Sequence, residues 1–136
     1  MKRLLAVAAV LVVAAGITAA FGFAQGNADG GAPAYALVVG SSGTPQLIQS
    51  HTNGFVGVNV GTFGQGDYCL TPAPGVDVIH TAAVASEEAF YSNAAGFVTV
   101  RYPPTPQDCR SNQLEVKTFD QSVALTNQIA FTVNVP

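Results

Sequence analysis

Charged residues are scarce in this 136-residue sequence, at 10% of the chain, and basic residues are the scarcest. Five lysines and arginines stand against eight aspartates and glutamates, and two of the five, Lys2 and Arg3, open the chain. The remaining three cations against eight anions leave a net charge of −5. Because nucleic acids and anionic lipid surfaces are bound by clustered cations, the sequence predicts neither partner.

The sequence contains none of the three catalytic or nucleotide-binding motifs that its glycines, serines and acidic residues could suggest. The segment 40–43 (GSSG) lacks the spacing of a hydrolase nucleophile elbow. The glycine-rich segment 61–66 precedes an expected strand, whereas a phosphate loop needs a helix at that point. Glu87 and Glu88 are adjacent, so they cannot face one substrate as a paired acid and base. We therefore expect no enzyme, no cofactor and no metal ligands.

The two histidines leave one enzymatic alternative open. His51 or His80, together with Asp67 or Asp77, could form a small secreted hydrolase, since a histidine beside a carboxylate is a common general base. The spacing of these residues does not itself bring them together. The hydrolase therefore remains an alternative prediction.

The N-terminus has the layout of a secretory signal. A positive start (MKR) precedes an unbroken run of leucine, alanine and valine. Small residues allow cleavage after Ala24 or after Ala20, and we expect a signal peptide over residues 1–24. An uncleaved membrane anchor is the alternative, because the apolar run is about long enough to cross a bilayer. The protein is expected to be secreted or associated with the cell envelope, with no stable membrane insertion after cleavage.

The rest of the chain reads as a flexible lead-in and one domain. Residues 25–34 (QGNADGGAPA) show no periodicity and predict the lead-in. Residues 35–136 suffice for one domain, and short alternating runs punctuated by Gly, Pro and Asn predict a small antiparallel β-sandwich, Ig-like or jelly-roll-like. The expected strands are 35–39, 46–51, 55–60, 67–70, 76–85, 96–102, 114–119 and 129–135.

The strongest local turn signal is Asn53-Gly54, between two of the expected strands. A type I′ hairpin needs positive φ at both turn residues, and this dipeptide favours it. The hairpin register would place Val56, Val58 and Val60 on one buried face.

Cys69 and Cys109 are the only cysteines. An even count in an exported chain predicts a disulfide. The alternatives are a redox pair, which usually has Cys-x-x-Cys spacing, and metal thiolates, which need further ligands nearby. Neither pattern is present, so we expect a structural bond that closes the domain.

The segment 102–110 (YPPTPQDCR) is the most distinctive loop. Its three prolines favour extended conformations, and Cys109 would anchor one end. A rigid exposed loop loses little entropy on binding, so this is a candidate binding loop, and a secreted inhibitor acting through it is a further alternative. The expected contact residues are Tyr102, Pro103, Pro104, Pro106 and Arg110.

Four short patterns resemble those of uncharacterised small exported β proteins of actinobacteria. They are G-x-Y-C at 66–69, D-C at 108–109, E-V-x-T-F at 115–119 and F-x-x-x-V-P at 131–136. The resemblance covers roughly residues 55 to 136 and implies a bacterial secreted context, with no activity and no functional residue attached. The expected function is a secreted, non-enzymatic binding or structural module of the cell envelope or extracellular space, whose partner is an extracellular protein or a glycan.

Overall fold

The computed structural model describes residues 33–40, 43–102, 104–105 and 107–136. The signal peptide expected over 1–24 and nearly all of the lead-in lie outside these residues, as do Pro103 and Pro106 of the candidate loop. Within the described part, no helix has the length and hydropathy to span a membrane.

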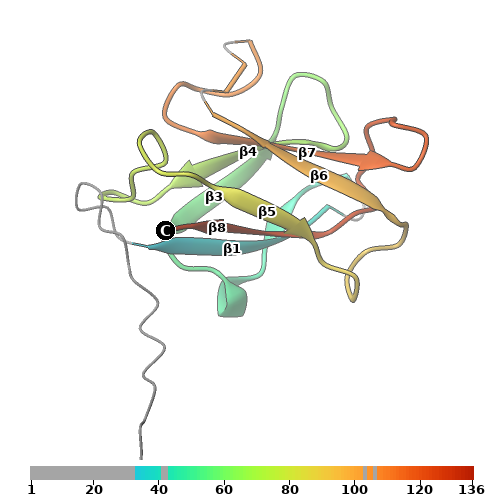
Figure 1. Cartoon of the computed structure of the whole chain (residues 1–136), viewed down its shortest axis with the longest axis horizontal. Coiled ribbons are helices and arrows are strands. Elements are labelled where there is room, and N and C mark those ends of the chain that lie inside the picture. Colours follow the sequence, from blue (N-terminus) through green and yellow to red (C-terminus); the bar gives the residue numbers. More distant parts are fainter. Residues whose placement is uncertain (1–32, 41–42, 103, 106) are drawn as a thin grey trace, which may run out of the picture.

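Two antiparallel four-stranded sheets pack face to face (Figure 1), which confirms the predicted small β-sandwich. Sheet 1 has the order β2-β1-β8-β5, and sheet 2 has the order β3-β4-β7-β6. The strands are β1 (Ala34–Val39), β2 (Gln46–Leu47), β3 (Phe55–Val60), β4 (Asp67–Pro72), β5 (Val84–Glu87), β6 (Gly96–Arg101), β7 (Leu114–Asp120) and β8 (Phe131–Val135), and a short 3-10 helix, η1 (Gln49–His51), follows β2.

Alternate side chains of the central strands fill the space between the sheets. In sheet 2, β4 and β7 direct Tyr68, Leu70, Leu114 and Val116 into the core. From sheet 1, Phe131 on β8 meets Tyr68 with ring centroids 5.4 Å apart. Because a strand turns successive side chains to opposite faces, the residues between these belong to the outer face of sheet 2.

Residues 102–113 connect β6 to β7, and we call them the β6–β7 connection. Its described residues contact this outer face over β4 and β7, through Thr105 and Asp108. Cys69 on β4 and Cys109 in the connection form a disulfide with a Cα–Cα distance of 5.4 Å, which confirms the predicted bond. Asp67 and Glu115 lie on this outer face and are nevertheless buried. The disulfide thus attaches the β6–β7 connection to β4, above polar residues that would be exposed if the sandwich had only its two sheets.

The hairpin predicted at Asn53-Gly54 is wrong. Gly54 has a positive φ of 75°, but Asn53 does not, whereas a type I′ turn needs both. The strand β2 pairs with β1, and β3 pairs with β4. The backbone of Asn53 exchanges two hydrogen bonds with that of Tyr35 on β1. Gly54 therefore carries the chain from one sheet to the other.

A β-bulge alters the face that β3 buries. The register against β4 shifts between Phe55 and Gly57, so Phe55 is buried and Val56 is 65% exposed. Val58 packs against the core as expected, and Val60 is more exposed. A bulge inserts one extra residue on one strand, so Phe55 and Val56 before it are out of step with the alternation of the residues after it.

Residues 76–83 are irregular, with a bend over 78–81, so the strand expected over 76–85 exists only at its end, as β5. Asp77 explains the change, because its Oδ1 accepts hydrogen bonds from the backbone N–H groups of Ile79 and His80. A short acidic side chain that binds nearby backbone in this way competes with strand pairing.

Candidate functional site

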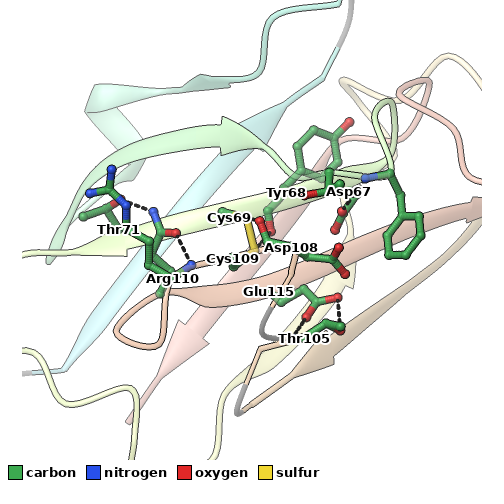
Figure 2. Close-up of a disulfide and its surroundings, with 12 residues drawn as sticks. Asp67, Tyr68, Cys69, Thr71, Thr105, Asp108, Cys109, Arg110 and Glu115 are labelled. Carbon is green, nitrogen blue, oxygen red and sulfur yellow. Dashed lines mark hydrogen bonds between the residues drawn. A yellow bond between two sulfur atoms is a disulfide. The ribbon is translucent and has the colours of Figure 1, made fainter.

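Three carboxylates and one ammonium group meet beneath the β6–β7 connection. Asp67 comes from β4, Glu115 and Lys117 come from β7, and Asp108 belongs to the connection. The three acidic side chains are 0% exposed and that of Lys117 is 19% exposed. Figure 2 shows Asp67, Asp108 and Glu115 close to the Cys69–Cys109 bond. We call these four charged residues the carboxylate cluster.

Strand register and the disulfide assemble this cluster. Asp67 pairs directly with Lys117 across the β4–β7 ladder, and Cys69 pairs with Glu115. Glu115 and Lys117 are two residues apart, so both side chains leave the same face of the sheet. Asp108 precedes Cys109 in sequence and is carried over the strand pair by the disulfide.

Lys117 lies between the acidic side chains. Its Nζ is 2.5 Å from Glu115 Oε1, 3.2 Å from Asp108 Oδ2 and 3.9 Å from Asp67 Oδ1. The same ammonium lies 4.7 Å from the centroid of the Phe63 ring, a cation–π contact. Glu115 also accepts hydrogen bonds from the backbone N–H and the hydroxyl of Thr105, which joins it to the β6–β7 connection (Figure 2).

Two carboxylate oxygens of the cluster have no hydrogen-bond donor. Asp67 Oδ2 accepts a hydrogen bond from the backbone N–H of Phe63, but Asp67 Oδ1 accepts none. Asp108 Oδ1 is likewise buried without a partner. Buried polar oxygens in proteins are nearly always paired, so these two mark a site with more acceptors than donors.

The cluster shifts the pKa values of its members in different directions. Burial raises the pKa of Asp67 and outweighs the attraction of Lys117. Burial also works to raise the pKa of Glu115, but hydrogen bonds from Lys117 and Thr105 outweigh it, so that pKa is lowered. Burial works to lower the pKa of Lys117, whereas hydrogen bonds to Glu115 and Asp108 raise it. The ammonium and the Glu115 carboxylate therefore form the charged pair.

Stability should fall at alkaline pH as Lys117 loses its proton. Its pKa in the folded protein is raised above the usual value of 10.5. The stabilisation is therefore complete below that value and is lost as the pH rises through the folded-state pKa. We expect the difference in melting temperature between the wild type and Lys117→Met to shrink above this pH. A difference that stays constant would contradict the assignment. Tyr68, whose pKa burial raises, titrates in both proteins and cancels in the comparison.

The residues of the hydrolase alternative fall into different parts of the fold. Asp77 and His80 do pair, with Oδ2 and Nδ1 2.7 Å apart, in the exposed turn before β5. The hydrogen bond from His80, followed by those from two backbone N–H groups, lowers the pKa of Asp77. Asp67 belongs to the carboxylate cluster, and His51 ends η1 with its Nδ1 3.0 Å from Ser50 Oγ. The Asp77–His80 pair has the geometry of a side chain that caps its own turn.

The described residues of the candidate binding loop are only partly exposed. Tyr102 packs against the core and Pro104 is buried, whereas Arg110 is exposed. Gln113 accepts a hydrogen bond from the backbone N–H of Arg110 and donates one to Thr71. Arg110 borders an open hollow of about 540 Å³ beside the disulfide. Recognition through this loop stays a prediction, and among its described residues Gln107 and Arg110 are exposed.

A second hollow, of about 440 Å³, was not predicted from the sequence. Tyr35 on β1 and the adjacent Phe90 and Tyr91 after β5 line it, with exposed fractions of 47%, 83% and 40%. We call this feature the aromatic hollow. The signal in the sequence was the Phe-Tyr pair in an otherwise polar turn, but Tyr35 is brought beside it only by the fold. The remaining lining residues are Ala36, Leu37, His51, Glu88, Thr132, Val133 and Asn134.

Comparison with family models, with curated proteins and with solved structures gives no match to this chain. The two candidate sites therefore rest on the geometry of this chain alone.

Proposed function

We propose that this protein is a secreted or envelope-associated module that binds a glycan in the aromatic hollow. The observation that carries the proposal is the group of three exposed aromatic rings around one concavity. Large apolar side chains gathered at the surface of a soluble domain mark interaction sites, and a hollow of this size is in the range of small-ligand sites.

The rings are held in place by local contacts. Phe90 and Tyr91 pack edge to face, with centroids 5.0 Å apart and an interplanar angle of 83°. Glu88 Oε1 accepts a hydrogen bond from the backbone N–H of Phe90, which fixes the turn. A preorganised aromatic surface loses little entropy when a ligand binds.

The chemistry of the lining suits a sugar. A sugar ring presents C–H groups on its faces and hydroxyl groups at its rim, and the electron-rich face of an aromatic ring attracts the polarised C–H groups. Glu88, Thr132 and Asn134 border the same hollow and can exchange hydrogen bonds with hydroxyl groups. A protein partner would more often require a larger apolar surface, so the glycan is the partner that we propose.

Export is consistent with the covalent structure. A disulfide that closes a small domain persists in oxidising compartments, outside the cytosol. Together with the signal peptide expected over residues 1–24, it supports a site of action at or beyond the cell envelope.

The first test is binding of the oxidised protein to insoluble peptidoglycan, chitin and cellulose, followed by calorimetry with soluble fragments. We expect Phe90→Ala to weaken binding by about tenfold, because one buried aromatic contact contributes that order of energy. Its melting temperature should not change, since Phe90 makes few contacts with the core at 83% exposure.

A matched control is Phe97→Ala, which removes an exposed aromatic ring from sheet 2 instead. It should bind like the wild type. Equal binding by the wild type and by both Phe90→Ala and Tyr35→Ala, or the absence of binding to all three polysaccharides, would remove glycan recognition by the aromatic hollow.

A further inference from the structure

The carboxylate cluster lies on the opposite sheet from the aromatic hollow and has no part in the proposed function. We propose that Asp67, Asp108 and Glu115 bind one divalent cation, and that this cation is calcium. One carboxylate oxygen from each residue lies within 4.8 Å of those of the other two. Calcium binds oxygen at about 2.3 to 2.6 Å, so a single ion at the centre of these oxygens reaches all three once they move inward by a few tenths of an ångström.

The two oxygens without donors are the second observation. Asp67 Oδ1 and Asp108 Oδ1 belong to side chains with no exposed surface, and neither accepts a hydrogen bond. In this part of the chain no donor reaches either oxygen at hydrogen-bond distance, and the ammonium of Lys117 comes no closer than 3.9 Å to Asp67 Oδ1. A metal ion satisfies such lone pairs where no N–H or O–H group is within reach.

Charge balance selects a divalent ion. Metal binding requires all three carboxylates in their ionised form, and together with the Lys117 ammonium they then carry two negative charges on side chains that have no exposed surface. A monovalent ion would leave one of them unbalanced. A divalent ion brings the sum to zero with Lys117 still present.

The position of Lys117 sets the strength of binding. Its Nζ lies within 3.9 Å of one oxygen of each acid, so it occupies part of the space that the ion needs. Its side chain is 19% exposed, and the ammonium can withdraw toward solvent as the ion enters. This competition predicts modest affinity, with a Kd of about 0.1 to 1 mM, as in extracellular calcium modules.

The donor set selects calcium among divalent ions. The cluster offers only carboxylate oxygens, and the neighbouring sulfurs of Cys69 and Cys109 are committed to the disulfide. Oxygen-only sites favour hard cations, and calcium accepts irregular coordination that magnesium does not. The ion would join β4, β7 and the β6–β7 connection beside the covalent bond.

Calorimetric titration of the oxidised protein with calcium chloride, after dialysis against EDTA, tests this site. We expect one calcium per chain and a melting temperature that rises with calcium concentration, because the ion binds the folded state. Asp67→Asn and Asp108→Asn should each weaken binding at least about tenfold through the loss of one charged ligand. Glu87→Gln, which changes an exposed acid on β5, should bind as the wild type does.

Lys117→Met is the reciprocal test and keeps the proposal falsifiable if an Asp67 variant does not fold. Removal of the competing ammonium should tighten calcium binding and make the melting temperature depend strongly on calcium. The proposal is overturned if neither the wild type nor Lys117→Met takes up calcium at about 10 mM, ten times the weakest expected Kd. An equal response to magnesium would overturn the assignment of calcium.

Discussion

Replacement of Cys69 and Cys109 by serine is expected to lower the free energy of unfolding by about 4 kcal/mol. The bond closes a loop with a sequence separation of 40 residues, and its main effect is to restrict the unfolded chain. Denaturant unfolding of the oxidised wild type and of the double variant measures the difference. For a domain of this length such a loss is a large share of the total stability.

Reduction provides the control for this prediction. The wild type in excess dithiothreitol should unfold at the same midpoint as the double serine variant, and the variant should not respond to the reductant. Amide exchange should also accelerate in the β6–β7 connection, because Cys109 no longer attaches it to β4. Coincident unfolding curves for the oxidised wild type and the variant would show that the bond does not contribute to the free energy of unfolding.

Lys117→Met is expected to destabilise the calcium-free protein by about 3 kcal/mol at neutral pH. The change removes the ammonium that neutralises the carboxylates around it and leaves three buried acids without a cation. Loss of one partner of a buried ion pair is more costly than loss of an exposed pair, because the remaining charge cannot be solvated. Urea unfolding in EDTA at neutral pH measures the effect.

The pH dependence separates charge from packing. Without Lys117, burial and the repulsion between neighbouring carboxylates raise the folded-state pKa of Asp67 further, and Glu115 loses the hydrogen bond from Lys117 that lowers its pKa. Stability lost to this repulsion is therefore regained as the pH falls through those values. We expect the deficit of Lys117→Met to shrink toward about pH 4, the usual range of carboxyl groups. A deficit of the same size at both pH values would show that lost side-chain packing, and not charge, is responsible.

Much of the sandwich could be predicted from period-2 alternation. Val98 and Val100, Leu114 and Val116, and the residues of β8 all pack as their patterns indicate, because each strand has one face on the core. The error at Asn53-Gly54 shows the limit of local signals. The dipeptide fits a tight hairpin. In the fold, however, Asn53 pairs with Tyr35 on β1, and this tertiary contact outweighs the local preference for a hairpin.

The candidate sites could not be predicted because their members are far apart in sequence. Asp67, Asp108 and Glu115 meet only through the β4–β7 register and the disulfide. The pairing register of two strands distant in sequence cannot be deduced from the sequence alone. Tyr35 reaches Phe90 and Tyr91 through the pairing of β1 and β5 with β8. Spacing along the chain reveals sites within one element, whereas these sites are built from several.

The pairing of the first and last strands determines how the domain would respond to tension. Ala34 at the start of β1 lies opposite Val135 at the end of β8, so the start of the first strand and the end of the last strand lie at one side of the sandwich (Figure 1). A pull on these ends would load the hydrogen bonds between β1 and β8 one after another, and the strands would unzip at low force. The disulfide would then withhold the 40-residue loop from extension, about 140 Å of contour length. The fully stretched protein would therefore extend through the residues outside the disulfide loop, and the covalent bond would set the limit of its extension.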